Sequence, residues 1–142
     1  MEQKETTHLK RLVIKKKFEH TTRIKTYSIE EIFTFLRDNP FPYGRNKQYY
    51  VDSEGNRMAV KRARVFLEKG IECKCGLRGS FFALESHRDG SFHLDLFAKD
   101  EVGDDVLMTI DHIHPASKGG SNTIGNYDPM CKVCNEEKSD KI

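Results

Sequence analysis

Hydrophobic residues recur at helical spacing early in the chain, directly after Ser28. Ser28 and Glu31 have the spacing of a capping box, and Tyr27 and Ile32 flank the same start as a hydrophobic staple. The apolar positions that follow fall on one face of a helix, namely Ile29, Ile32, Phe33 and Leu36. Pro40 and the two polar residues before it end the pattern. We therefore predict a packing helix here, with no chemistry of its own.

A second helical pattern runs from about Met58 to Lys69 and closes at Gly70. A short strand over residues 48–51 and a turn over residues 52–56 precede it. Its apolar positions share one side, namely Ala59, Ala63, Phe66 and Leu67. Its basic residues lie largely elsewhere, namely Lys61, Arg62 and Arg64. This basic face fits either contact with a phosphate backbone or an ordinary solvated surface.

Strand-like patterns replace the helical ones between residues 76 and 113. Residues 81–85, 92–96 and 106–110 are apolar segments separated by turn-forming residues, and the middle segment alternates apolar and polar positions. This pattern predicts an antiparallel sheet. His93 falls on the polar side of its strand, and we expect it at the surface.

The composition indicates a single small domain, with or without an N-terminal extension. The chain has 142 residues, of which 37% are hydrophobic and 32% charged, so its core must be modest. No apolar stretch is long enough to cross a membrane, and no secretory signal follows Met1, so we expect a cytoplasmic protein.

Charge is divided unevenly along the chain. Residues 1–72 hold 16 Lys and Arg against 10 Asp and Glu, whereas residues 73–142 hold 8 against 12. A basic half joined to an acidic half suits a protein that grips a polyanion and holds cations, although such unevenness also arises without function. The basic residues before residue 26 fit either a nucleic-acid-binding arm or a solvated tail, namely Lys10, Arg11, Lys15, Lys16, Lys17, Arg23 and Lys25.

Four cysteines form two close pairs, Cys73 with Cys75 and Cys131 with Cys134. In a reducing compartment such pairs are candidates for metal binding rather than for disulfides. The spacing of the second pair lets both sulfurs reach one zinc ion. Asn135 follows at once, and its side-chain oxygen is a suitable ligand for Mg²⁺ or Mn²⁺.

Asp111, His112 and His114 crowd the end of the third predicted strand, just before Pro115. Neighbouring side chains of a strand point to opposite faces, so Asp111 and His112 cannot both face one ion. One of them can bind a cation while the other carries out proton chemistry. A Gly-Gly loop follows at residues 119–120.

Residues 110–140 resemble the HNH endonuclease family, in the version that contains a cysteine-bound zinc site. The resemblance is carried by the sequence Asp-His-Ile-x-Pro, the Gly-Gly loop, Asn126, and Cys-x-x-Cys-Asn-x-x-Lys ending at Lys138. It extends more loosely over residues 71–141, where residues 69–73, Gly76 and residues 81–85 are similar to small bacteriophage HNH proteins. It says little about residues 1–70.

The resemblance implies a role for each matching residue. His112 corresponds to the general base that activates water, and Asp111 and Asn135 correspond to the ligands of a catalytic Mg²⁺ or Mn²⁺. Asn126 corresponds to the residue that braces the loop and orients the histidine, and His114 to a supporting histidine of some members. The pKa of histidine suits a base near neutral pH, and two protein ligands leave room for phosphate and water on the ion.

The implied fold is α+β: a ββα-metal finger with strands near residues 107–113 and 127–131 and a helix near residues 132–140. A four-cysteine Zn²⁺ site staples it, and a small antiparallel sheet and an N-terminal helical, basic region precede it. We thus divide the chain into residues 1–70 and a nuclease domain of residues 71–142. The family's first zinc pair is usually Cys-x-x-Cys, so Cys73-Lys74-Cys75 requires a tighter turn, and a three-cysteine site is the alternative.

The sequence thus predicts an endonuclease that hydrolyses DNA. Candidate contacts to the nucleic acid are Arg62, Lys118 and Lys138, although Lys138 equally suits the end of a helix. The rivals are a catalytically silent module that keeps the zinc scaffold to bind nucleic acid or protein, and a redox or zinc-sensing domain. The oligomeric state stays open, with a homodimer among the options, and so does the specificity of cutting. For a protein of phage origin, the expected compartment is the host cytoplasm.

Overall fold

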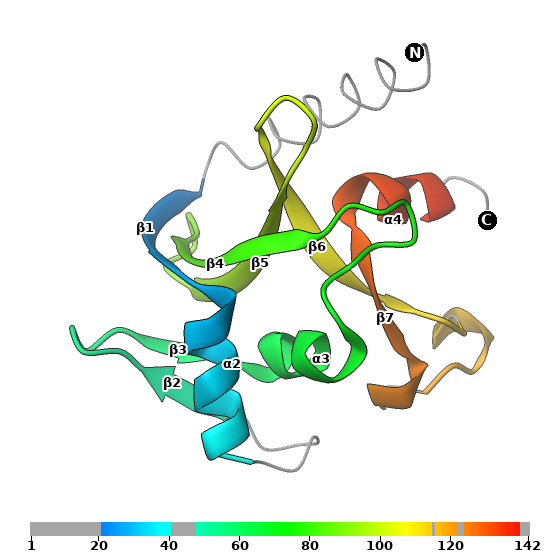
Figure 1. The fold of residues 1–142 in the computed structure, drawn as a ribbon. Helices are drawn as coiled ribbons and strands as arrows, with labels where there is room; N and C mark the ends of the chain where they lie inside the picture. The colour runs from blue at the N-terminus through cyan, green and yellow to red at the C-terminus, as the bar shows by residue number, and fades with distance from the viewer. Residues whose placement is uncertain (1–20, 41–47, 115, 122–123, 140–142) are drawn as a thin grey trace.

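A five-stranded antiparallel sheet forms the centre of the computed structural model, which describes residues 21–40, 48–114, 116–121 and 124–139 (Figure 1). The strand order is β1-β4-β5-β6-β7, and β2 and β3 form a separate hairpin. The strands are β1 (Thr22–Tyr27), β2 (Tyr49–Val51), β3 (Arg57–Ala59), β4 (Gly79–Ser86), β5 (Phe92–Lys99), β6 (Asp105–His112) and β7 (Tyr127–Cys131). The α-helices are α2 (Ile29–Asp38), α3 (Lys61–Lys69) and α4 (Lys132–Ser139), with short 3-10 turns at Ala116–Lys118 and Ile124–Asn126.

The core lies between the sheet and the helices α2 and α3. Ile32 and Leu36 of α2 and Phe66 of α3 are fully buried against Phe82 and Leu96 of the sheet. The same cluster continues through β6 and β7 into the start of α4. Ser28 caps α2 by accepting a hydrogen bond from the backbone N–H of Glu31, as the capping pattern predicts. The apolar face of α2 is therefore the one that the sequence indicated.

Strands β5 and β6 pair only at one end. The ladder joins residues 97–99 of β5 to residues 105–107 of β6, and from Met108 onward β6 pairs with β7 instead. The two strands therefore diverge, and β6 runs away from β5 toward β7 (Figure 1). This divergence opens a wedge in the sheet, and the candidate site lies beside it.

The predicted ββα arrangement is present at the C-terminal end of the chain. β6 and β7 form an antiparallel hairpin whose register pairs Met108 with Cys131 and His112 with Tyr127. α4 follows β7 without a loop and packs on both strands. The three sheet strands predicted within residues 81–110 are also confirmed, each slightly longer than expected.

The helix predicted from Met58 begins later, at Lys61. The predicted turn before it is the cause, because Asp52 Oδ1 accepts hydrogen bonds from the backbone N–H groups of Glu54 and Asn56. That turn folds residues 57–59 back on β2 as strand β3, which buries Met58. The prediction of a helix over residues 58–60 was therefore wrong.

Arg64 does not lie on the surface where the sequence placed it. Its side chain is buried, and its guanidinium donates to the backbone carbonyl of Asn39 at 3.0 Å and to Oε1 of Gln48. It thus ties the end of α2 to the start of the β2–β3 hairpin. Of the three basic residues predicted to share one outer face of α3, only Lys61 and Arg62 are exposed.

Residues 22–27 form an edge strand, β1, that the sequence did not predict. Arg23 contacts Glu85 at 3.3 Å and Asp105 at 2.8 Å, and Lys25 contacts Glu54 at 2.6 Å. These two cations are therefore engaged within the protein. The more N-terminal basic residues, including residues 10–11 and 15–17, lie outside the described residues. No helix in the described part of the chain has the length and apolar character needed to cross a membrane.

Candidate active site and cysteine cluster

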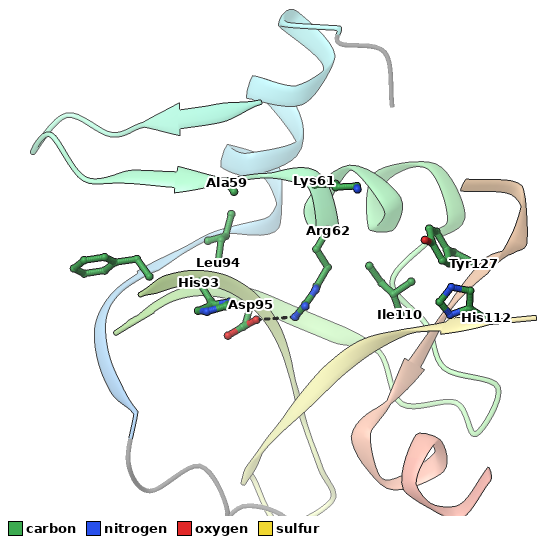
Figure 2. A pocket seen from close by; sticks show the side chains of 10 residues that line it. Ala59, Lys61, Arg62, His93, Leu94, Asp95, Ile110, His112 and Tyr127 are labelled. Atoms are coloured by element: carbon green, nitrogen blue, oxygen red, sulfur yellow. Dashed lines mark hydrogen bonds and ion pairs between the residues drawn. The ribbon is translucent and has the colours of Figure 1, made fainter. Parts of the chain in front are cut away.

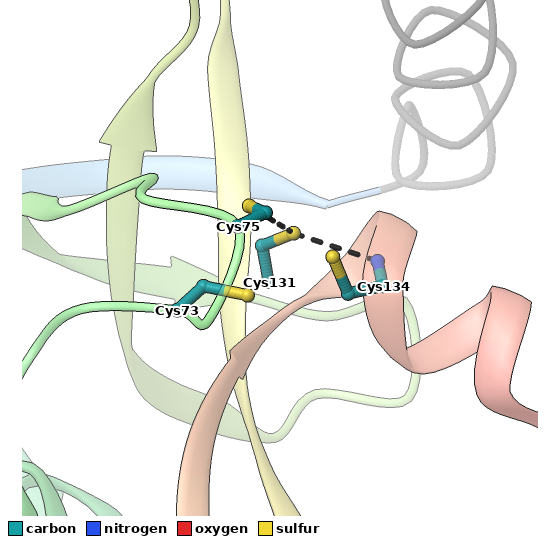
Figure 3. A group of neighbouring side chains, drawn as sticks. All are labelled: Cys73, Cys75, Cys131 and Cys134. Atoms are coloured by element: carbon teal, nitrogen blue, oxygen red, sulfur yellow. Dashed lines mark hydrogen bonds between the residues drawn. The ribbon is translucent and has the colours of Figure 1, made fainter.

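The four cysteines converge between the loop before β4 and the junction of β7 with α4 (Figure 3). Their four Sγ atoms all lie within 4.8 Å of one another, and those of Cys75 and Cys131 are 3.9 Å apart. Sulfurs that surround zinc tetrahedrally at about 2.3 Å stand about 3.8 Å from one another. The distances between the four sulfurs would therefore need to shorten only slightly for all of them to bind a single metal ion.

The short spacing of Cys73 and Cys75 is accommodated by a tight turn. The N–H of Gly76 donates to the carbonyl of Cys73, and the N–H of Cys73 donates to the carbonyl of Leu77, both at 2.8 Å. Gly76 has a φ of 95°, which residues with a side chain rarely adopt. The turn brings both sulfurs to the cluster with only one residue between them.

Burial and mutual repulsion control the ionisation of these thiols. Burial, together with the neighbouring sulfurs of Cys73 and Cys75, raises the pKa of Cys131 to about 12, against a hydrogen bond from the Cys134 N–H. Burial and the same kind of repulsion raise the pKa of Cys134. Burial also opposes ionisation of Cys73, but hydrogen bonds from its neighbours outweigh it and lower that pKa. A bound cation is what would allow several of these thiols to be thiolates together.

Asp111 and Thr109 lie on the face of β6 that α4 covers. Lys138 Nζ donates to Asp111 Oδ2 at 2.5 Å and to the backbone carbonyl of His112 at 3.1 Å. One helical turn earlier, Asn135 Nδ2 donates to Thr109 Oγ1 at 2.8 Å. The two predicted ligands of the catalytic ion thus come from facing surfaces of β6 and α4.

Thr109 is a residue that the sequence analysis missed, and it determines the orientation of Asn135. Its hydroxyl donates to the carbonyl of Met130 at 2.7 Å, so the same oxygen must accept from Asn135. This hydrogen-bond chain assigns the amide nitrogen of Asn135 to Thr109 and turns its oxygen elsewhere. A carboxylate and an amide oxygen are hard donors of the kind that Mg²⁺ and Mn²⁺ prefer.

His112 lies on the other face of β6, away from α4. Its ring packs edge-on against Tyr127, with the ring centroids 4.8 Å apart. Both rings line an open pocket of about 360 Å³ (Figure 2). The side chains of Asp111 and His112 therefore point to opposite sides of one strand.

The pocket occupies the wedge between β5 and β6. Residues 92–95 form one wall, and Ile110 and His112 form the other. Lys61 and Arg62, at the start of α3, lie above it, and Arg62 reaches Asp95 (Figure 2). His93 is exposed, as expected. Asp95, predicted on the polar side of its strand, is buried beneath Arg62.

Asn126 ties together the two ends of the loop that follows β6. Its Oδ1 accepts from the backbone N–H of His114 at 2.8 Å, while its Nδ2 donates to the carbonyls of His114 and Ser121 at 3.0 and 2.8 Å. Its own carbonyl accepts from the N–H of Ile113. His114 in turn bonds through Nε2 to the carbonyl of Lys118 at 2.9 Å. This network fixes the backbone directly after His112.

Residues 98–141 match the family model for HNH endonucleases. The matched segment contains β6, β7, α4, two of the four cysteines and the residues Asp111, His112, Asn126 and Asn135. The resemblance predicted from the sequence is thereby confirmed for this segment, and the match supports a ββα-metal finger. Comparisons with curated proteins and with solved structures found no match.

Proposed function

We propose that this protein is a metal-dependent endonuclease that hydrolyses the phosphodiester bonds of DNA. The observation that carries the proposal is the arrangement around β6, within the segment that matches the HNH family. His112 faces an open pocket, while Asp111 beside it faces the helix that presents Asn135. Hydrolysis requires a base that activates water and a cation that neutralises charge on the phosphate. The imidazole on one side of the strand suits the first task, and the two hard donors on the other side suit the second.

The cysteine cluster is proposed to hold a structural Zn²⁺ through Cys73, Cys75, Cys131 and Cys134. Four sulfurs within 4.8 Å of one another fit a closed tetrahedral site, which is typical of structural rather than catalytic zinc. Cys134 lies in the first turn of α4, directly before Asn135. Zinc binding would therefore fix the start of the helix that carries the proposed catalytic ligand.

Asp111 and Asn135 are the proposed ligands of a catalytic Mg²⁺ or Mn²⁺. When bound, such an ion neutralises charge on the phosphate and stabilises the leaving oxygen. Thr109 acts as a positioning residue, because its hydroxyl holds the Asn135 amide by its nitrogen. Lys138 holds the Asp111 carboxylate in place. Lys138 and Lys118 are proposed contacts to the phosphate backbone.

His112 is the proposed general base, which takes a proton from the attacking water at a ring nitrogen. Tyr127 packs on one side of its ring and limits its rotation. Asn126 is proposed to act through the backbone, since its side chain bonds to the backbone of His114 and Ser121. His114 supports the same loop through the Lys118 carbonyl.

The test uses supercoiled plasmid, with Mg²⁺ or Mn²⁺, and compares the wild-type protein with His112→Ala. We expect the wild type to produce nicked or linear DNA, and His112→Ala to cut about 10²- to 10⁴-fold more slowly, the usual contribution of a general base. His87→Ala is the matched control, because it removes an imidazole outside the pocket. Thermal melting of all three proteins establishes that each is folded.

Two results would count against the proposal. Cutting by His112→Ala at the wild-type rate would show that this imidazole is not the base. Failure of the wild type to cut single-stranded, duplex or branched DNA with any divalent ion would favour a silent module that binds nucleic acid or protein.

A further inference from the structure

The wedge between β5 and β6 lies directly beside the ββα finger and is lined partly by residues outside it. The β5–β6 ladder ends at Phe97 and Leu107, so no strand within the described residues pairs with residues 92–96 of β5 on the β6 side. The pocket lies in this opening, and the imidazole of His112 forms part of its wall. Its volume of about 360 Å³ lies within the range of pockets that bind small ligand groups. A substrate group in this wedge would therefore lie next to the proposed base.

Arg62 is held at the mouth of this wedge by a buried acid. Its Nη1 lies 3.2 Å from Oδ1 of Asp95, and the arginine side chain is 48% exposed, whereas that of Asp95 is only 10% exposed. A guanidinium has five N–H donors, so this bond leaves others for an anion. An arginine fixed from behind by a carboxylate loses less freedom when it binds phosphate in the fork geometry.

The remaining walls of the wedge suit a nucleotide backbone. Lys61 adds a second cation next to Arg62, and Phe92 on the opposite wall is 52% exposed. Grooves that bind a nucleic acid strand combine cations, which follow the backbone, with exposed aromatic rings, on which bases stack. Among the described residues that line the wedge, Asp95 is the one carboxylate, and Arg62 covers it.

We propose that this wedge binds a backbone phosphate of the strand being cut, next to the scissile one, with Arg62 as the phosphate ligand and Asp95 as its positioning residue. This inference rests on the proposed function and adds the site where the substrate strand is held. It assigns the substrate path to α3 and to residues 92–95 of β5, which precede the segment that matches the HNH family.

The test measures kcat/KM for plasmid cutting by Arg62→Ala, with Arg37→Ala as the control. Arg37 is also an exposed arginine paired with one carboxylate, Glu30 at 3.8 Å, but it lies on α2 away from the pocket. Loss of a charged hydrogen bond to phosphate predicts a fall of about ten- to a hundredfold for Arg62→Ala. Arg62→Lys keeps the charge without the fork and should recover part of the loss. Arg37→Ala should match the wild type.

Binding without cutting provides a second readout, measured by fluorescence anisotropy with a duplex oligonucleotide on the His112→Ala protein. Adding Arg62→Ala should reduce the slope of log affinity against log salt by about 1, because one phosphate contact is lost. Equal effects of Arg62→Ala and Arg37→Ala in both assays would overturn the inference. If the wild type does not cut at all, the proposed function fails, and the binding slope alone decides this inference.

The positioning role of Asp95 is tested by a double-mutant cycle. Asp95→Asn should lower kcat/KM in the wild-type background but have no further effect when Arg62 is already alanine, because it acts through Arg62. Melting curves of each variant identify any loss of folding. Additive effects of the two substitutions would refute the positioning role.

Discussion

Replacing Thr109 by valine isolates the hydrogen-bond chain that orients Asn135. The substitution keeps the branched shape of the side chain but removes the hydroxyl, which donates to the Met130 carbonyl at 2.7 Å and accepts from Asn135 at 2.8 Å. Each such bond contributes about 0.5–1.5 kcal/mol net, so the loss of both should destabilise the fold by about 1–3 kcal/mol. The melting temperature should fall by several degrees.

The effect on metal activation should exceed the effect on stability. Without the hydroxyl, the Asn135 amide is free to turn, so its oxygen is no longer committed to the ion. Residues that orient a metal ligand typically change metal affinity or activity by about 10- to 100-fold when they are removed. We therefore expect the Mg²⁺ concentration for half-maximal plasmid cutting to rise by about that factor in Thr109→Val.

Thr109→Ser is the matched control, because it loses a methyl group but keeps both hydrogen bonds. The assay titrates Mg²⁺ against the initial cutting rate for both variants, at a temperature where each is fully folded. We expect the serine variant to follow the wild-type curve. A valine variant with the wild-type Mg²⁺ dependence would refute the orienting role, and equal shifts in both variants would assign the effect to packing.

Two further predictions concern the cysteine cluster and a buried acid in the β2–β3 turn. Cys134→Ser should lower bound zinc below one ion per chain, as measured by atomic absorption, and unfold α4, because zinc binding and folding are coupled in such sites; full zinc content in this variant would argue for a three-cysteine site. A hydrogen bond from Tyr27 lowers the pKa of Asp52 in the folded protein, against the effect of burial. The ionised Asp52 therefore stabilises the fold fully above the pKa of an unfolded aspartate, and this stabilisation is lost as the pH falls toward the lower folded-state pKa. Asp52→Asn should therefore flatten the fall in melting temperature between about pH 5 and pH 2, a range that reaches below the pKa of an unperturbed aspartate, and an unchanged acid-side slope would contradict this assignment.

The ββα finger was predictable because its signals are local. A short apolar segment marks β6, Pro115 follows its end, and the cysteine pair marks the start of α4. Each of these features is set by a few residues that are neighbours in the sequence. The position of each element therefore needed no knowledge of distant contacts.

Strand β1 and the burial of Arg64 were not predictable in this way. β1 is an edge strand with four of its six side chains exposed, and charged residues on such an edge hide the apolar alternation. Arg23 is stabilised by Glu85 and Asp105, more than 60 residues away in sequence. Arg64 is buried because it meets the end of α2. In each case the partner that explains the residue comes from another part of the chain.

The ion pair between Asp111 and Lys138 affects how the proposed catalytic ion would bind. In this structure Asp111 is neutralised by Lys138, three residues beyond Asn135 on the same helix, so an ion at Asp111 must compete with that ammonium. The Lys138 side chain is one third exposed, so releasing it to solvent or to a substrate phosphate costs little. The carbonyl of His112 also accepts from Lys138, so its release would loosen the backbone at the proposed base at the same time. Lys138 therefore couples the two faces of β6: the charge that holds Asp111 before the ion binds also holds the backbone that carries His112.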